Sequence, residues 1–232
     1  MTTIESTWPA PAITTRPGLS HGWPRDGVTM GWDEHLALYG PMRASRRIPR
    51  GGDRALVDAV RQAGLRGRGG AWFPTHVKLA EVAAGASRSR PPIVVANGCE
   101  GDPASNKDHV LLGLAPHLVL DGIEFAARAV GATEAVICVH RDDMMADVLR
   151  EAVDQRRPSG TVPAGAGPAG FPVRVAEVPA RYVASVDTSL VNFLNTGVAR
   201  PLARDPRPSQ RGVDGRPTLV DNVETLAHLA LI

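Results

Sequence analysis

Cysteine is scarce in this 232-residue chain, which contains only Cys99 and Cys138. Two cysteines cannot build a disulfide scaffold, and their separation fits no zinc-ligand spacing, although one disulfide between them is compatible with the sequence. Cys138 lies in an apolar run and is expected in the core. Glu100 and Asp102 follow Cys99 and would oppose the low pKa that a reactive thiol needs, so we expect a packing role for Cys99 and no metal site.

An excess of charge and long apolar runs are also missing. Lys and Arg number 26 against 24 Asp and Glu, a net charge of +2, and the arginines are scattered through loops. A nucleic-acid binder usually carries a clustered basic stripe, so no nucleic-acid partner is expected. No apolar run reaches the ~18 residues of a membrane span, and the first residues lack the pattern of a signal peptide. The sequence therefore predicts a soluble, cytoplasmic protein with no direct membrane span.

Residues 1–47 are rich in Pro, Thr and Arg and cannot build a core of their own. We interpret them as an extended arm with a short helix near Asp33 to Tyr39. Tryptophans are spaced along the arm, and in such a segment they more often hold the chain on a neighbouring surface than form a binding cage. One folded domain is expected over 48–232, a length that can bury a full core.

Short apolar runs alternate with segments of helical periodicity from residue 53 onward. The pattern predicts a helix from Asp53, its N-cap, to Gly64, and a second helix capped by Thr75. The apolar face of the second helix would carry Val77, Val82 and Ala83. Strands are predicted over 92–96, 135–139, 173–178 and 218–220, and further helices over 107–114, 116–130, 142–155, 188–194 and from about Asn222.

This alternation is typical of an α/β, Rossmann-like domain, with a mostly parallel sheet flanked by helices and joined by right-handed crossovers. Two loops rich in Pro and Gly are expected at 157–170 and 196–216. Ligands bind such sheets beyond the carboxyl ends of the strands. The segment that starts at Asn97 and the Asp221–Asn222 turn both fall at such ends, so we expect them to contribute to a ligand site.

The segment Leu65–Thr75, here called the glycine bend, connects two predicted helices. Gly67, Gly69 and Gly70 allow tight curvature and let a ligand approach the main chain. Free backbone amides beside a helix start favour an anion such as phosphate, and the bend also carries arginines. The spacing matches neither a Walker motif nor a dinucleotide fingerprint, because the bend follows a helix rather than a strand. A flexible helix–helix connection is equally compatible with the spacing alone.

Several motifs, in order along the chain, resemble one protein family. Residues 64–75 read Gly-Leu-Arg-Gly-Arg-Gly-Gly-Ala-Trp-Phe-Pro-Thr, with Lys78 after them. This stretch resembles the signature of the NADH-binding flavoprotein (51 kDa) subunit of respiratory complex I, which NAD-reducing hydrogenases and NAD-linked formate dehydrogenases share. Further matches are Asn97–Pro103 with Lys107-Asp108, Pro116–Leu118, Tyr182 and Pro217–Leu226. The resemblance covers about Ile48 to the end of the sequence.

The resemblance implies a noncovalently bound FMN on which NADH stacks for hydride transfer. Lys78 would lie beside the flavin, Asn97 would hydrogen-bond it, and Asn222 with Thr225 would hold its phosphate and ribityl end. Phe73 would offer its ring to the dinucleotide. The milder alternatives are a turn residue at Asn97, a helix cap at Asn222 and a core residue at Phe73. The implied cofactor-binding residues are Gly67, Arg68, Gly69, Gly70, Lys78, Asn97, Cys99, Glu100, Asp221, Asn222 and Thr225, and those on the NADH side are Phe73, Asp102 and Asp187.

The sequence departs from the family pattern at four places in this implied pocket. Trp72 stands where the family has a glycine, and Cys99 where it has an aspartate that contacts the flavin. The run 185–188, Ser-Val-Asp-Thr, replaces Gly-Glu-Glu-Thr, so one acid is lost and another is shortened. Asp221 replaces an asparagine, and its carboxylate would repel a phosphate unless it is protonated or turned away. Together these changes indicate a changed ligand, a changed electron donor or a loss of catalysis.

The leading hypothesis is an FMN-dependent oxidoreductase subunit that passes electrons between NAD(P)H and an iron–sulfur or ferredoxin-like partner, in a complex that can be membrane-associated. The alternatives are a non-catalytic relative that keeps the fold for assembly, a flavin module reduced by ferredoxin and, more distantly, a nucleotide-phosphate enzyme without flavin. The ubiquitin-like and 4Fe-4S domains of the family have no counterpart in this sequence, so we expect no iron–sulfur cluster in this chain. A Trp72 indole that filled the pocket would contradict flavin binding.

Overall fold

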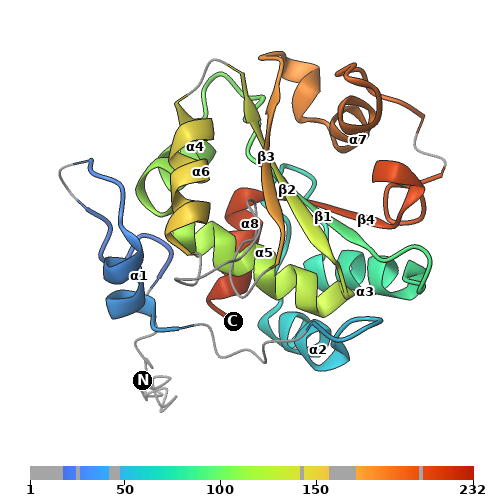
Figure 1. Cartoon of the computed structure of the whole chain (residues 1–232), viewed down its shortest axis with the longest axis horizontal. Coiled ribbons are helices and arrows are strands. Elements are labelled where there is room, and N and C mark those ends of the chain that lie inside the picture. Colours follow the sequence, from blue (N-terminus) through green and yellow to red (C-terminus); the bar gives the residue numbers. More distant parts are fainter. Residues whose placement is uncertain (1–17, 25–26, 42–47, 142–143, 157–170, 204–205) are drawn as a thin grey trace, which may run out of the picture.

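One parallel sheet forms the centre of the molecule (Figure 1). The computed structural model describes residues 18–24, 27–41, 48–141, 144–156, 171–203 and 206–232. The sheet has the order β3-β2-β1-β4, with all described neighbours parallel. Its strands are β1 (Ile93–Asn97), β2 (Glu134–His140), β3 (Val173–Val178) and β4 (Thr218–Asn222). The predicted α/β fold is confirmed.

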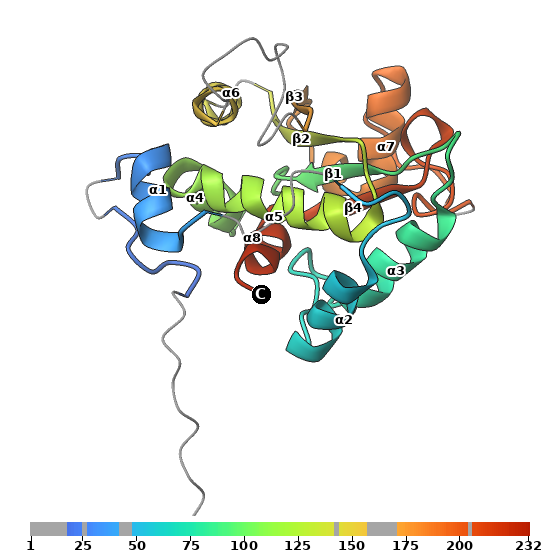
Figure 2. The same cartoon turned by 60° about the horizontal axis from the view of Figure 1, so that its bottom comes forward.

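Helices cover both faces of the sheet, as Figure 2 shows for α5 and α8 on one side and α7 on the other. The helices are α1 (Trp32–Tyr39), α2 (Arg54–Ala63), α3 (Thr75–Gly85), α4 (Lys107–Leu114), α5 (Pro116–Val130), α6 (Met145–Gln155), α7 (Asp187–Thr196) and α8 (Val223–Ala230). Two short 3-10 helices, Tyr182–Ser185 and Val213–Gly215, lie on the α7 side. No single described helix has the length and apolar composition to cross a membrane; α4 and α5 together do, but they are bent by 98° at their junction.

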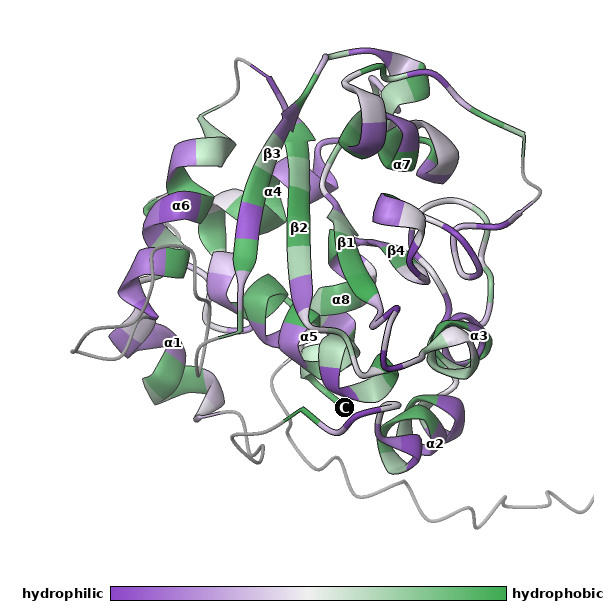
Figure 3. Ribbon diagram, turned by 45° about the vertical axis from the view of Figure 1, so that its right-hand side comes forward, coloured by the Kyte–Doolittle hydropathy of each residue, from purple (hydrophilic) through white to green (hydrophobic). Residues whose placement is uncertain are grey.

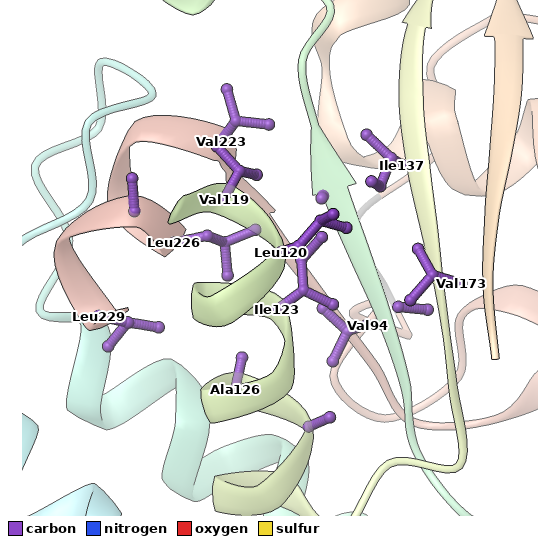
Figure 4. Packing of buried hydrophobic residues seen from close by; sticks show 14 of the residues in the cluster. Val94, Val119, Leu120, Ile123, Ala126, Ile137, Val173, Val223, Leu226 and Leu229 are labelled. Carbon is purple, nitrogen blue, oxygen red and sulfur yellow. The ribbon is translucent and has the colours of Figure 1, made fainter. Parts of the chain in front are cut away.

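The two faces of β1 enter two different hydrophobic clusters. Val94 and Ala96 pack in the cluster that contains α5 and α8, whereas Ile93 and Val95 pack in the cluster that contains α7. Figure 3 shows β1 and β2 as hydrophobic along most of their length, while the edge strand β3 also carries hydrophilic residues. In Figure 4, α5 lies between β1 and α8. This burial on both faces is what an apolar run in a parallel sheet predicts.

Three helix predictions differ in detail from the structure. Thr75 is not the N-cap of α3: Pro74 holds that position, and the Thr75 hydroxyl is buried without a hydrogen-bond partner among the described residues. The buried face of α3 carries Leu79 and Val82, while Val77 is half-buried. Helix α6 begins at Met145, and the predicted start at 142 lies outside the described residues, as does the loop over 157–170.

The described part of the N-terminal arm is held on the domain by a buried polar cluster. The predicted short helix is present as α1, and it packs on α5 through His35, whose Nε2 lies 2.8 Å from Asp121 Oδ2. Arg156 at the end of α6 donates to the other Asp121 oxygen, and its guanidinium lies 4.3 Å from the centre of the Trp32 ring. Although burial on its own raises the pKa of Asp121, the His35 hydrogen bond and the Arg156 charge hold it below its usual range. A tryptophan therefore does fasten the arm, as predicted.

His117 borders this cluster and should make the stability of the domain depend on pH. Burial, followed by the charge of Arg156, lowers its pKa to about 4. Between about pH 6.5 and pH 4 the His117 imidazole is therefore protonated in the unfolded chain but neutral in the folded chain. As the pH falls through this range, the free energy of unfolding decreases by about 1.4 kcal/mol per pH unit, or about 3 kcal/mol in all. Urea unfolding across this range should show a flatter pH profile for His117→Gln, which keeps a polar, uncharged side chain beside Gln155. The exposed-site control His21→Gln should follow the unmodified chain; equal slopes for all three proteins would contradict the prediction.

Candidate functional site

The carboxyl ends of β1 and β4 mark the point where the sheet reverses its strand order. From β1 the chain leaves through α4 and α5 to β2 and β3, and it returns through α7 to β4 on the other side of β1. The last residues of the two strands, Asn97 and Asn222, are direct partners in the parallel register. Crevices at such a reversal bind ligands in open α/β sheets. The two strand ends that the sequence analysis selected therefore lie side by side.

The glycine bend closes on itself and rests on α8. Thr75 N donates to Leu65 O at 3.0 Å, and Gly67 N donates to Phe73 O at 2.8 Å, so the two ends of the bend pair like a hairpin. Arg68 N donates to the Thr225 hydroxyl at 2.9 Å. These bonds hold the main chain of the bend over the start of α8, so this helix–helix connection is hydrogen-bonded both to itself and to α8.

A pocket of about 570 Å³ lies between the glycine bend, the loop 97–108 and the 3-10 helix Tyr182–Ser185. It brings together every predicted site residue except Thr225, which is fully buried beneath the bend. The predicted residues in its wall are Gly67, Arg68, Gly69, Gly70, Phe73, Lys78, Asn97, Cys99, Glu100, Asp102, Asp187, Asp221 and Asn222. Phe73 is 43% exposed there, which excludes the core alternative for its ring.

Asn222 links three segments at the base of the pocket. Its Oδ1 accepts from Glu224 N at 3.0 Å and caps α8, and it also accepts from Lys107 Nζ at 3.1 Å. Its Nδ2 donates to Asp108 Oδ2 at 2.6 Å. Burial raises the pKa of Asp108 in spite of Lys107 beside it. The predicted helix cap is present, and the same side chain also fixes the start of α4.

Three carboxylates of the pocket accept hydrogen bonds from residues close to them in the sequence. Glu100 accepts from the Ser105 hydroxyl and from Asp108 N, Asp102 accepts from Ala104 N at 2.9 Å, and Asp187 accepts from Thr188 N at 2.7 Å. These hydrogen bonds turn the carboxylate oxygens toward donors of the protein itself. Their repulsion of an anionic ligand is therefore weaker than their number indicates.

Asp221 differs from these three carboxylates. It is 5% exposed, and its Oδ1 accepts from its own neighbour Asn222 N at 3.1 Å, whereas Oδ2 is buried without a hydrogen-bond partner in the described part of the chain. Lys78 Nζ lies 3.8 Å from Oδ1 and donates to Val220 O at 2.6 Å. Burial raises the pKa of Asp221, and the charge of Lys78 opposes that rise.

Asn97 and Cys99 have mainly structural partners in this structure. Asn97 Nδ2 donates to Ser185 O at 2.7 Å, and its Oδ1 accepts from Cys99 N at 3.1 Å, as the turn alternative predicts. Both cysteines are free and buried. Burial raises the pKa of the Cys99 thiol above its ordinary value and that of Cys138 to about 12. The packing roles are confirmed, and the described residues contain no group of His, Cys, Asp and Glu that could hold a metal.

The Trp72 indole lies at the mouth of the pocket and leaves its volume open. The side chain is 55% exposed, and the Arg68 guanidinium lies 5.0 Å from its ring centre. Its backbone φ of 55° is in the left-handed region, where a residue other than glycine is strained. Arg66 supports this conformation by donating to Trp72 O at 3.3 Å. The indole therefore does not fill the pocket, which is the arrangement that would have contradicted flavin binding.

Replacing Trp72 should separate this backbone strain from the ring contact. At a left-handed position Trp72→Gly should be more stable than Trp72→Ala by about 1 kcal/mol, because only glycine adopts that φ without a steric penalty. Urea unfolding of both variants measures the difference. Ala80, on the exposed face of α3, is the matched control: Ala80→Gly should lose about 1 kcal/mol, the opposite order. If Trp72→Ala were as stable as Trp72→Gly, the claim of backbone strain at this position would be contradicted.

Some residues of the pocket were not selected from the sequence as site residues. Lys107 and Asp108 were noted only as part of a motif, yet Lys107 Nζ bonds Asp108 at 2.6 Å and Glu224 at 3.0 Å. Ser105 binds Glu100 and has no motif of its own. Tyr182 is 73% exposed at the pocket, and Ser185 accepts from Asn97 through its carbonyl oxygen. Their positions depend on contacts between segments far apart in the sequence.

Comparison with known proteins places these observations in one family. A family model described as the Nuo51 FMN-binding domain matches residues 60–231. The chain is 33% identical over 181 residues to an NADH-quinone oxidoreductase subunit of Aquifex aeolicus, covering 76% of this chain and 42% of that relative. It is 32% identical over 180 residues to the NADP-reducing hydrogenase subunit HndC of Solidesulfovibrio fructosivorans, covering 76% of this chain and 36% of that one.

A solved structure extends the likeness to the fold. The NAD⁺-reducing [NiFe]-hydrogenase in the H₂-reduced state matches with a TM-score of 0.66 and 32% identity, over 82% of this chain and 32% of that one. The chain spans 42% of the Aquifex aeolicus relative and 38% of the NADH dehydrogenase flavoprotein 1 of Dictyostelium discoideum, so it corresponds to one part of these longer proteins. With the family model covering most of its length, this chain belongs to the family of the Nuo51 FMN-binding domain.

Proposed function

We propose that this domain binds FMN noncovalently in the pocket and passes electrons between NAD(P)H and an iron–sulfur partner. The observation that carries the proposal is the pocket at the reversal point of the sheet, enclosed by the glycine bend and both strand ends. A cytoplasmic location and membership of a larger oxidoreductase complex belong to the same proposal.

The groups around the pocket suit a flavin nucleotide. Arg68 and Lys78 offer positive charge to a phosphate, and α8 begins at the pocket wall, where its dipole favours an anion. A Cβ on Gly69 would be in ordinary van der Waals contact with Asn222 Cβ at 3.6 Å, so the bend lies directly against the end of β4. FMN, when bound, supplies the conversion between two-electron and one-electron transfer; this chain supplies position and charge.

Exposed rings at the mouth suit a second aromatic ligand. Trp72, Phe73 and Tyr182 line the pocket with 55%, 43% and 73% of their surface exposed. Such faces stack on flat heterocycles, which supports NAD(P)H as the electron donor. Val186, which lines the pocket where the family has an acid, favours a second candidate: a flavin module reduced by an iron–sulfur protein instead of a nicotinamide.

Titration of the purified protein with FMN tests the cofactor, and the flavin fluorescence should be quenched on binding. Lys78→Ala should weaken FMN binding at least about tenfold because it removes a charge from the pocket wall. Arg61→Ala removes an exposed arginine of α2 and is the matched control, with unchanged affinity expected. Absence of saturable FMN binding by the unmodified chain would refute the proposed function.

Anaerobic addition of NADH and of NADPH to the flavin-loaded protein tests the donor. Bleaching of the flavin by either nucleotide supports the leading proposal. A flavin that stays oxidised with both nucleotides but is bleached by a reduced ferredoxin supports the second candidate. A flavin that none of the three reduces would contradict electron transfer and leave an assembly role.

A further inference from the structure

Asp221 is a buried acid in the wall of the candidate cofactor pocket whose charge is poorly compensated. It is the penultimate residue of the edge strand β4, at the end that meets the pocket, and one of its carboxylate oxygens has no hydrogen-bond partner among the described residues. A buried carboxylate without partners loses the hydration that stabilises its charge. The ionised form therefore depends strongly on any cation within reach.

Lys78 is the cation that faces Asp221, and it also faces the pocket. The Nζ–Oδ1 distance of 3.8 Å is too long for a hydrogen bond, and Nζ donates instead to Val220 O at 2.6 Å. The Lys78 side chain is 34% exposed and lines the pocket. The ammonium group thus lies between a buried carboxylate on one side and the space of the ligand on the other.

The other basic groups around Asp221 already lie beside carboxylates. From the glycine bend, Arg68 Nε lies 3.9 Å from Glu224, and from α4, Lys107 Nζ binds Asp108 at 2.6 Å and Glu224 at 3.0 Å. On α8, His228 lies 3.6 Å from the same Glu224, and β1 contributes the uncharged Asn97 to this end of the sheet. Lys78 is therefore the cation on which the ionised form of Asp221 depends, while the Asn222 amide and the Thr225 hydroxyl favour that form as neutral donors.

An anion that enters the pocket competes for Lys78. Its negative charge adds to the potential at Asp221, and the pairing of Lys78 with the anion weakens the field that keeps the carboxylate ionised. Resting on the proposed binding of FMN, we propose that Asp221 takes up one proton from solvent when a phosphate-bearing flavin binds beside Lys78. The carboxylate becomes a neutral carboxylic acid, and the charge of the bound phosphate is kept. This also removes the repulsion that an aspartate at this place would otherwise exert on the ligand.

Calorimetric titration at pH 8 in two buffers of different ionisation enthalpy measures the protons taken up on binding. The unmodified chain should take up about one proton per FMN, so that its dissociation constant should rise up to about tenfold per pH unit above pH 7. Asp221→Asn preserves the shape of the side chain and should take up none, with a nearly constant affinity. Glu81→Gln, which removes a partly exposed acid one turn along α3 from Lys78, should behave as the unmodified chain.

Riboflavin separates the phosphate from the ring system. It lacks the anion and should bind without proton uptake, whereas uptake with riboflavin would overturn the coupling to the phosphate. Three results would overturn this inference but not the proposed function. They are FMN binding by the unmodified chain without proton uptake, equal proton uptake by Asp221→Asn, and loss of FMN binding in Asp221→Asn. Failure of the unmodified chain to bind FMN at all is the separate result that refutes the proposed function.

Discussion

The Gly122→Ala protein should be less stable than the unmodified chain by more than about 3 kcal/mol. Gly122 lies in α5 where this helix crosses α8, and a Cβ there would come within 1.8 Å of Leu226 O and 2.3 Å of its carbonyl carbon. These atoms belong to the backbone, so no rotamer change relieves the clash and the two helices must separate. Because Asn222 caps α8 and Thr225 lies in its first turn, separation of the helices should also displace the base of the pocket and weaken FMN binding.

Gly113→Ala is the matched control for this prediction. Gly113 lies in α4, and a Cβ there would meet only the Met145 side chain, at 3.7 Å. Alanine is favoured over glycine inside a helix by up to about 1 kcal/mol, so this variant should be as stable as the unmodified chain or more so. Urea unfolding of both variants gives the comparison. A loss below about 1 kcal/mol in Gly122→Ala would mean that the α5–α8 crossing adjusts without cost.

Helix and strand positions could be predicted where one local signal decides them. Pro116 fixes the first turn of α5, and Asp53 with Gly64 sets the two ends of α2, since each acts on neighbours within a few residues. Thr75 shows where such reasoning fails. Its hydroxyl is a good cap in isolation, but its backbone N–H donates to Leu65 O, a contact across the glycine bend that draws Thr75 into the helix.

The site residues could be selected from the sequence, but most of their contacts could not. Apolar runs and the periodicity of hydrophobic residues predict that Asn97 and Asn222 lie at strand ends. In a parallel sheet the carboxyl ends of the strands lie at one edge, which puts both residues there. The register that makes them direct partners and the bond from Lys107 to Asn222 join positions more than a hundred residues apart. No local pattern encodes these contacts. Asp221 and Lys78 could each be selected from the sequence, but their proximity to one another could not be predicted.

Asn222 explains why the fold and the candidate site depend on one another. The same side chain caps α8, binds Asp108 at the first turn of α4 and borders the pocket. α4 and α8 contact each other and follow β1 and β4, the two strands on either side of the reversal point. Any change that frees Asn222 should therefore loosen both helices at their pocket ends and disturb the groups that face a ligand.

Asn222→Ala should lower the stability of the domain by about 3 to 4 kcal/mol and the affinity for FMN by about 100-fold. Loss of the α8 cap costs about 1 kcal/mol, and the buried Asp108 carboxylate left without its amide donor at 2.6 Å costs about 2 to 3 kcal/mol more. Asn222→Asp keeps the cap but sets a second carboxylate against Asp108, so it should regain stability as the pH falls and one acid is protonated.

Asn106 is the matched control, because it occupies the N-cap of α4 without a side-chain cap bond, and Asn106→Ala should change stability by less than about 0.5 kcal/mol. Urea unfolding and FMN titration measure both effects, and equal losses for the alanine variants at 106 and 222 would show that the buried contacts of Asn222 contribute nothing.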